Sequence, residues 1–280
     1  MTVRVEHGMR LLAEFPIEAR ARIVGVLADI DDTITTGGRL TAAAYTALER
    51  LNAAGIRVIP VTGRPAGWCD HIARMWPVDA VVGENGAFWM RYESAARRLK
   101  TVFAGPPAPD RHQRIDVLAA AILAAVPGCA LASDQFCRVA DLAIDYCEDV
   151  APLPPAAVRA IVQRMEAAGM RARVSSIHVN GWFGDHDKLS TTRRLLAEEF
   201  GISLETQAER ERWVFVGDSP NDAPMFGFFP NAVGVANVRD FADQLEASPA
   251  WVTQARAGAG FVELCEALVA ARRQALTAER

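Results

Sequence analysis

Hydrophobic and polar positions divide the first part of the chain into short apolar runs and longer helical repeats. Apolar runs of strand length cover residues 23–28, 56–61 and 79–82, as expected for strands buried on both faces. Between them, apolar residues recur at helical spacing over residues 40–52, and a second helix is expected over 66–76. This order of strand, helix, strand, helix and strand predicts a parallel sheet with right-handed crossovers.

The pattern changes after residue 86. Residues 87–92 and 98–103 indicate a strand pair, helices are expected over 111–126 and 154–168, and strands over 139–146 and 171–179. The parallel pattern returns with a helix to residue 200, strands at 213–216 and 232–236, and a C-terminal helix at about 260–275. We therefore expect an α/β core domain, residues 1–86 and 185–280, interrupted by an α+β cap domain with its own antiparallel sheet, residues 87–184.

The composition narrows the class of protein. The chain has 280 residues, of which 51% are hydrophobic, and a net charge of −4, which argues against a nucleic-acid binder with a basic surface. No apolar stretch is long enough to span a bilayer, and residues 1–22 predict a short amphipathic helix ending near Pro16. The five cysteines form no CxxC pair, so a zinc site and a disulfide framework are both disfavoured. We expect a cytoplasmic monomer or homodimer without nucleic-acid or membrane partners.

Two carboxylates follow the first buried strand. Asp29 and Asp31 are two residues apart, so their side chains point to the same side of the chain. Both stay ionised at low cost only if a cation lies between them, and Mg²⁺ prefers such oxygen ligands. Taken alone, the cluster could also be an acidic turn or a helix cap.

Polar groups also follow other strands of the expected sheet. Thr62 and Gly63 come after the second strand, Lys188 begins a helix, and Asp218 and Asp222 follow the strand at 213–216. In an open parallel sheet, ligands bind beyond the carboxyl ends of the strands. A carboxylate nucleophile, an acid/base and cations suit phosphoryl transfer through an aspartyl-phosphate. Lys188 would act there as a point charge, and Thr62 would donate a hydrogen bond.

These groups match four motifs in order, and the sequence resembles the phosphatases of the haloacid dehalogenase (HAD) superfamily. Asp29-Ile30-Asp31-Asp32-Thr33 matches DxDxT, Thr62 and Lys188 match the second and third motifs, and Gly217-Asp218-Ser219-Pro220-Asn221-Asp222 matches GDxxND. The resemblance implies a HAD-like Rossmannoid core, with Asp29 as the nucleophile and Asp31 as the acid/base. It also implies Mg²⁺ at Asp29, Asp31, Asp218 and Asp222, and phosphate at Thr62, Gly63, Lys188 and Asn221. One departure is Asp32, where glycine is common.

The turn before the cap domain and the cap domain itself indicate a narrower group within this superfamily. The stretch Gly83-Glu84-Asn85-Gly86-Ala87 and the large cap between the second and third motifs resemble the Cof-like sugar phosphatases with a type IIB cap. The stretch Gly258-Ala259-Gly260-Phe261 is similar to that of mannosyl-3-phosphoglycerate phosphatases. Polar or aromatic side chains that could contact the substrate are Arg64, Asn85, Arg138, His178, Asn180 and Trp182. Each of them also has a structural interpretation, as a surface, turn or packing residue.

The motifs together predict a function. We expect a Mg²⁺-dependent phosphatase that hydrolyses a small phosphorylated metabolite, most of all a sugar phosphate. A phosphomutase would use the same pair of aspartates, and a non-catalytic module that binds phosphate esters is the alternative from another class. The cap residues would then set the specificity for the substrate.

Overall fold

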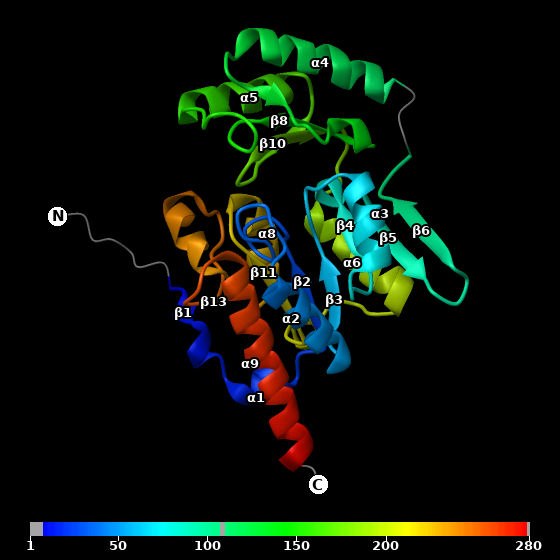
Figure 1. Cartoon of the computed structure of the whole chain (residues 1–280), viewed down its shortest axis with the longest axis vertical. Coiled ribbons are helices and arrows are strands. Elements are labelled where there is room, and N and C mark those ends of the chain that lie inside the picture. The colour runs from blue at the N-terminus through cyan, green and yellow to red at the C-terminus, as the bar shows by residue number, and fades with distance from the viewer. Residues whose placement is uncertain (1–7, 107–109, 279–280) are drawn as a thin grey trace, which may run out of the picture.

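The computed structural model describes residues 8–106 and 110–278, and the chain folds into a core with a cap above it (Figure 1). The core sheet has the order β1 (Arg10–Leu11), β13 (Trp251–Val252), β12 (Val233–Gly234), β11 (Trp213–Gly217), β2 (Gly25–Ala28) and β3 (Arg57–Pro60). All neighbouring strands in it are parallel. The predicted α/β fold with a parallel sheet is therefore confirmed, and β2 lies inside the sheet between β11 and β3.

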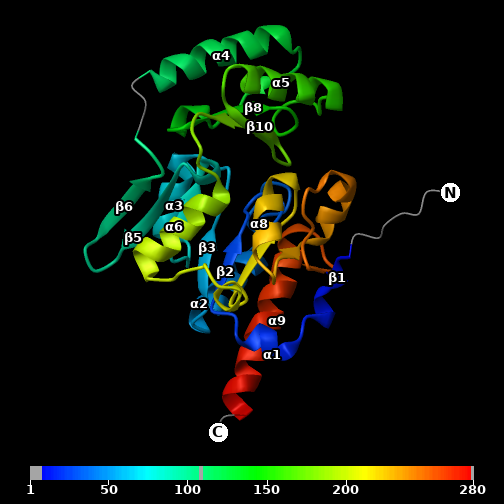
Figure 2. The ribbon, with the colours of Figure 1, turned by 180° about the vertical axis from the view of Figure 1, so that it is seen from behind.

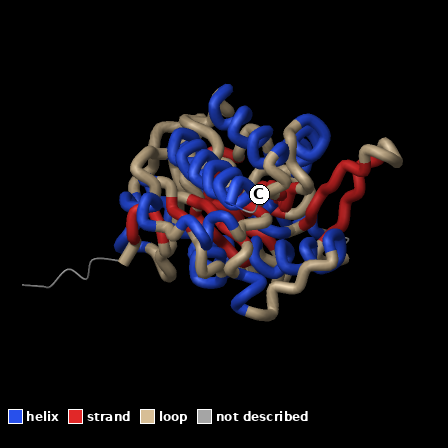
Figure 3. The backbone as a smooth tube through the Cα atoms, turned by 90° about the horizontal axis from the view of Figure 1, so that it is seen from below, coloured by secondary structure: helices blue, strands red, loops and turns tan. Residues whose placement is uncertain are grey.

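Helices cover both faces of this sheet (Figures 2 and 3). Successive strand residues face opposite sides, so Val26 and Ala28 of β2 pack in one apolar cluster with α2 (Ala42–Ala53), α3 (Ala66–Met75) and α9 (Ala257–Ala278). Leu27 packs in the other cluster, with α6 (Lys188–Phe200) and α8 (Ala223–Phe228). The continuous apolar runs of the sequence thus correspond to strands buried on both faces.

The strand pair expected in the cap lies in the core. β4 (Val81–Gly83) continues the core sheet through a parallel bridge between Val61 and Val82, and β5 (Phe88–Glu93) pairs with β4 and with β6 (Arg98–Phe103). Trp89 of β5 packs in the same cluster as Leu195 of α6. The assignment of residues 87–103 to the cap sheet is corrected, because an antiparallel pattern does not reveal which sheet a hairpin joins. The division into a core and a cap at residues 87–184 otherwise stays a prediction.

The cap has an antiparallel sheet of its own, in the order β7 (Ala130–Leu131), β8 (Asp141–Asp145), β10 (His178–Trp182) and β9 (Arg171–Val174). Helices α4 (Arg111–Ala125) and α5 (Pro155–Ala167) lie above this sheet, away from the core (Figure 1). Ile122, Ile144 and Ile161 are buried in a separate apolar cluster between them. The single strand expected over residues 171–179 is instead a hairpin of β9 and β10, which turns at residues 175–177.

Short elements complete the chain. They are the 3₁₀ helices η1 (Leu12–Glu14), η2 (Glu84–Gly86), η3 (Gln135–Cys137), η4 (Pro220–Asp222) and η5 (Ala236–Gln244), and the helices α1 (Ile17–Ala21) and α7 (Gln207–Arg210). The helix expected to end near Pro16 is reduced over residues 8–15 to the short 3₁₀ helix η1, because Arg10 and Leu11 pair with β13, and α1 begins after Pro16. Residues 1–7 of that expectation lie outside the described residues. Across residues 8–106 and 110–278, no helix is both long and apolar enough to cross a membrane.

Candidate active site

Asp29 and Lys188 meet at the carboxyl edge of the core sheet. Asp29 follows β2, and Lys188 is the first residue of α6, whose start is fixed by a capping box between Asp187 and Ser190. Nζ of Lys188 donates hydrogen bonds to Oδ1 of Asp29 at 2.7 Å and to Oδ1 of Asp222 at 2.8 Å. All three side chains are buried. The fold therefore joins three of the four motifs in one contact.

Three carboxylates form a buried cluster around this lysine. Asp29, Asp218 and Asp222 each offer an oxygen, and these oxygens lie within 4.8 Å of one another. Gly217 makes the close packing possible, since a Cβ there would come within 2.2 Å of Oδ2 of Asp222. Oδ2 of Asp222 accepts a hydrogen bond from the amide of Asp218 at 3.1 Å, whereas Oδ1 of Asp218 is buried and has no hydrogen-bond partner among residues 8–106 and 110–278.

The cluster fits a divalent cation. One lysine cannot neutralise three carboxylates, and burial raises the pKa of Asp29 to about 8 although Lys188 opposes the rise. Burial and the charge of Asp29 also raise the pKa of Asp218 well above its usual range. A cation would relieve this repulsion, and carboxylate oxygens are the ligands that Mg²⁺ prefers. Three of the four predicted metal ligands thus come together, and Asp31 lies outside their cluster.

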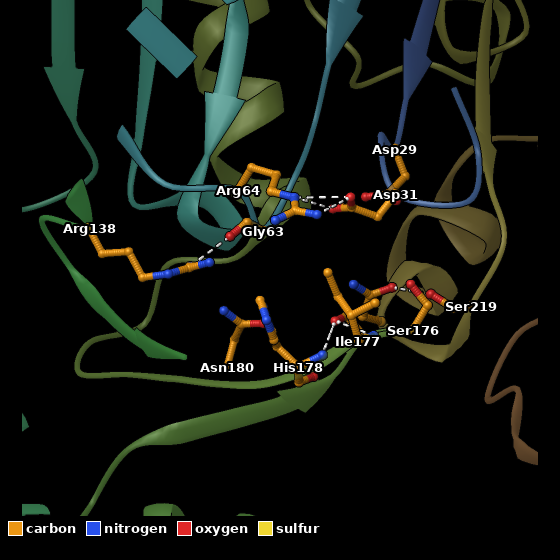
Figure 4. A pocket seen from close by; sticks show the side chains of 12 residues that line it. Asp29, Asp31, Gly63, Arg64, Arg138, Ser176, Ile177, His178, Asn180 and Ser219 are labelled. Atoms are coloured by element: carbon orange, nitrogen blue, oxygen red, sulfur yellow. Dashed lines mark hydrogen bonds and ion pairs between the residues drawn. The ribbon is translucent and has the colours of Figure 1, made fainter. Parts of the chain in front are cut away.

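Asp31 instead faces Arg64 (Figure 4). Nε of Arg64 donates to both carboxylate oxygens of Asp31 at 3.0 Å, and Nη2 donates to one of them at 2.8 Å. The next residue, Asp32, has a left-handed backbone with φ of 52°. Glycine adopts this conformation most readily, and aspartate tolerates it better than most side chains do. The backbone therefore accounts for the glycine that is common at this motif position.

Arg64 also joins the core to the cap. Its Nη2 donates to Oε1 of Glu148 at 2.8 Å, and its Nη1 donates to Asp134 at 3.4 Å. Nε2 of His178 lies 2.8 Å from the other oxygen of Glu148. The contact with His178 and then the guanidinium of Arg64 lower the pKa of Glu148 to about 2, although burial opposes this. A continuous series of polar contacts thus connects the cap to the core. It runs from His178 to Glu148, then to Arg64 and Asp31.

A second set of contacts fixes part of the cap on the core. Glu84 is fully buried, and its carboxylate accepts hydrogen bonds from the amides of residues 139–141 at 2.6 to 3.1 Å and from Ala66, the first residue of α3, at 3.0 Å. Burial, followed by the charge of the nearby Asp141, raises the pKa of Glu84 to about 7. Nη1 of Arg138 donates to the carbonyl of Gly63 at 2.9 Å (Figure 4). Residues 138–141 are therefore attached directly to the core.

The turn after β3 holds two of the four predicted phosphate-binding residues, Thr62 and Gly63. The amide of Arg64 donates to Oγ1 of Thr62 at 3.0 Å, and the amide of Asn85 donates to the carbonyl of Thr62 at 3.0 Å. Within the described part of the chain, Nδ2 of Asn85 is buried without a hydrogen-bond partner, and a Cβ on Gly63 would lie 3.2 Å from it. Gly63 and Asn221 line the same cavity as Asp29, whereas Thr62 is fully buried. The turn thus places a buried side-chain amide against Gly63, which lines the cavity.

Three cap residues line a small cavity together with the aspartates of the first motif. Arg138, His178 and Asn180 line it together with Asp29 and Asp31 (Figure 4). Its volume is about 10 Å³, which is room for about one water molecule. Nδ2 of Asn180 donates to Asp141 at 3.0 Å. Trp182, the remaining candidate, donates from Nε1 to the carbonyl of His186 at 2.9 Å and does not line this cavity, so its role here is structural.

Several residues of the site have no counterpart in the sequence predictions. Asn237 donates from Nδ2 to Oδ2 of Asp218 at 3.1 Å and to the carbonyl of Asp32 at 3.0 Å. It lies just beyond β12, so the rule that polar groups gather after parallel strands could have identified it. Glu84 lies in a turn, and Glu148 and Asp134 lie in cap loops, where no periodic pattern distinguishes them from surface acids.

The comparisons with known proteins agree with this arrangement. The sequence profile of the haloacid dehalogenase-like hydrolases matches residues 26–100, which include Asp29, Asp31 and Thr62. The sequence has no match among the curated proteins. The C-terminal domain of C. albicans trehalose-6-phosphate phosphatase is 11% identical with a TM-score of 0.69, over 94% of this chain and 98% of that chain.

Two further solved structures share the fold. A Thermoplasma acidophilum protein is 18% identical with a TM-score of 0.64, over 88% of this chain and 98% of that chain. The sucrose-phosphatase of Synechocystis, solved with sucrose and phosphate, is 15% identical with a TM-score of 0.58, over 88% and 97% of the two chains. At these identities the similarity shows the fold. The profile match over residues 26–100 and the shared fold agree with the resemblance to haloacid dehalogenase-like hydrolases that the motifs indicate.

Proposed function

We propose that this protein is a Mg²⁺-dependent phosphomonoesterase that acts on a small phosphorylated metabolite through an aspartyl-phosphate on Asp29. The observation that carries the proposal is the buried contact of Lys188 with both Asp29 and Asp222. It lies at the carboxyl edge of the parallel sheet, where open α/β folds bind ligands. A buried carboxylate held by a lysine beside two further carboxylates suits a nucleophile that must approach a phosphate.

The side chains present account for both half-reactions. An oxygen of Asp29 attacks phosphorus, and the bond between phosphorus and the ester oxygen breaks. Asp31 protonates the leaving alkoxide and then takes a proton from the water that attacks the aspartyl-phosphate. This second attack releases inorganic phosphate and restores the carboxylate of Asp29. Lys188 stabilises the negative charge at Asp29 and the phosphoryl group in both steps.

The residues that would hold the metal are Asp29, Asp218 and Asp222, which share the buried cluster. Bound Mg²⁺ would screen the charge between a carboxylate nucleophile and the phosphate. Asn237 would support this arrangement from outside, because it donates a hydrogen bond to Asp218. In this role Asn237 would orient the carboxylate, as the hydrogen-bond partners of metal ligands commonly do.

A sugar phosphate is the substrate class that we favour. The structural relatives include proteins named trehalose-6-phosphate phosphatase and sucrose-phosphatase. In this chain, the cap presents Arg138, His178 and Asn180 to the cavity, and such side chains can bind hydroxyl groups by hydrogen bonds.

The five cysteines are free, which agrees with a reducing compartment such as the cytoplasm.

Replacement of the nucleophile tests the proposal. Asp29→Asn should lower phosphate release from a panel of phosphate esters by at least about 10³-fold, because an amide cannot form the phosphoenzyme. Asp116→Asn, at an exposed position of α4, is the matched control and should keep its activity. Activity of Asp29→Asn within tenfold of the unaltered protein would refute the assignment of the nucleophile.

The same panel separates the alternative functions. A phosphomutase would form a phosphate isomer with little net release of phosphate, so both products should be measured. A binding module would bind the esters but turn none of them over with Mg²⁺ present. The complete set of Asp29, Asp31, Lys188 and Asp218 favours catalysis over binding alone.

A further inference from the structure

The catalytic cavity adjoins a much larger groove between the cap and the core. This groove has a volume of about 530 Å³, compared with about 10 Å³ for the catalytic cavity. Ser175 of the cap and Asn221 of the core line both spaces. Pockets that bind small ligands usually measure about 300–1,000 Å³. The groove is therefore large enough for a ligand portion that the catalytic cavity cannot hold.

Apolar side chains form most of the exposed wall of the groove, and the charged residues Arg159, Glu166, Arg173 and Glu246 complete its lining. Val158 and Val162 of α5 and Val174 of β9 line it from the cap, and Pro224 of α8 and Phe241 of η5 line it from the core. Phe241 is only half-buried and belongs to none of the apolar core clusters. Its ring therefore contributes a wall of the groove rather than packing of the interior, and an apolar ligand group could cover it.

The groove lies on the unattached side of the cap. On the other side, Glu84 holds residues 139–141, and Arg138 donates to Gly63. In the middle, Arg64 bonds to Glu148. Among the residues that the structure describes, no hydrogen bond or ion pair joins the cap wall of the groove to η4, α8 or η5. A ligand can therefore occupy the groove without breaking polar contacts.

We infer that this groove holds the alcohol portion of the phosphate ester, and that this portion extends beyond a single sugar ring and carries an apolar group. The inference rests on the proposed phosphatase function. The phosphate lies at Asp29, the ester bond passes between Ser175 and Asn221, and the apolar group contacts Phe241 and the valines of α5. A free monosaccharide phosphate would leave these apolar walls exposed to water.

Alkyl phosphonates of increasing length test the inference, because their P–C bond is not hydrolysed and binding is read without turnover. Ethyl-, butyl- and octylphosphonate are titrated calorimetrically with Mg²⁺ present. Each added methylene group should lower the Kd by up to about fourfold when it is fully buried. Gln244→Trp, at an exposed lining position of η5, should fill the groove and remove this dependence on length. Gln274→Trp, at an exposed position of α9, is the matched control and should preserve it.

A second variant tests the opposite change. Phe241→Ala removes one apolar wall without touching a core cluster, so it should weaken octylphosphonate more than ethylphosphonate. Equal Kd values along the series in the unaltered protein would overturn the inference, and so would an undiminished dependence on length in Gln244→Trp. If binding improves with length as expected but no phosphate ester is hydrolysed, the groove assignment is supported and the proposed function fails.

Discussion

Asp29 and Asp31 leave the same strand end but have different neighbours. Asp29 contacts Lys188 and lies in the carboxylate cluster, whereas Asp31 is held by the guanidinium of Arg64. This difference agrees with two roles, one for the group that bonds to phosphorus and one for the group that handles the proton. Arg64 would have to release Asp31 before that carboxyl group can donate to a leaving alkoxide.

The first prediction separates these two aspartates by kinetics. Acid/base assistance is typically worth about 10²–10⁴-fold, and a good leaving group needs little of it. Asp31→Asn should therefore lose more of its rate of phosphoenzyme formation with an alkyl phosphate than with p-nitrophenyl phosphate. Rapid-quench measurement of both rates at saturating Mg²⁺ checks this. Equal losses would mean that Asp31 only braces the loop or the metal site.

The second prediction concerns the metal without any reference to activity. An ion that binds only the folded state stabilises it, by about 2.7 kcal/mol when its concentration is 100 times its Kd. Added Mg²⁺ should thus raise the free energy of unfolding of the unaltered protein and of Asp116→Asn. Asp218→Asn should respond much less, because one oxygen of the cluster becomes an amide nitrogen. Urea unfolding with Mg²⁺ or with EDTA measures the effect, and an equal response of all three proteins would exclude the cluster as the site.

The turn η2 connects two elements through one side chain. Glu84 accepts hydrogen bonds both from the start of α3 and from the cap residues that lead into β8. Gly86 in the same turn lies close to the linker that returns from the cap, since a Cβ there would come within 2.1 Å of the carbonyl oxygen of Asp187. This turn therefore holds cap residues 139–141 and also lies against the linker that returns from the cap to the core.

The third prediction tests this turn as an anchor. In Glu84→Gln, one acceptor oxygen becomes an NH₂ group that faces buried amide donors, and each donor left unsatisfied costs about 1–3 kcal/mol. We expect a lower free energy of unfolding and faster hydrogen exchange at residues 139–141. Glu93→Gln, whose carboxylate pairs with the exposed Arg98, should change stability by less than about 1 kcal/mol. Unchanged exchange at residues 139–141 in Glu84→Gln would contradict the anchor.

Elements were predictable where local pattern decides them. The strand β2 and the helix α2 could be read from sequence because their apolar spacing and their ends are local features, with Thr41 as the helix cap and Gly55 in a left-handed conformation after the end. The hairpin of β5 and β6 was found as a strand pair but placed in the wrong sheet, since its partner β4 is chosen by packing against α6. The two-residue strands β1 and β13 are too short to show any period.

At the scale of the whole molecule, the sequence could indicate which groups gather at the candidate site, because most of them follow strands of one parallel sheet. The contacts between cap and core could not be predicted from sequence. Arg64 and its cap partner Glu148 are 84 positions apart in the chain, and Arg64 and Asp134 are 70 positions apart. Such pairs depend on how the two domains sit together, which no local pattern encodes. The sequence therefore indicated which groups of the core gather at the candidate site, and it left open how the cap contacts them.

The last prediction concerns how the cap opens. A cavity of about 10 Å³ has room for about one water molecule but not for a phosphoryl group, so we expect the cap to move, whereas Glu84 and Arg138 keep residues 138–141 on the core. We expect rotation about this anchor, with the groove side opening most. One pair of spin labels is placed across the groove, on the exposed Arg159 and Gln244. A second pair is placed beside the anchor, on Phe136 and Met75. The partly exposed cysteines, Cys129, Cys137 and Cys147, are first changed to serine.

Pulsed electron resonance then compares the two pairs without ligand and with Mg²⁺ and vanadate, a phosphate analogue. Across the groove, the distance distribution should be broad without ligand and should shorten and narrow when ligand selects the closed state. Beside the anchor, the distance distribution should be the same with and without ligand, because the buried hydrogen bonds to Glu84 persist in the open and the closed state. A matching shift at both pairs would mean that the cap lifts as a rigid body on its linkers, and no shift at either would mean that substrate reaches Asp29 without cap movement.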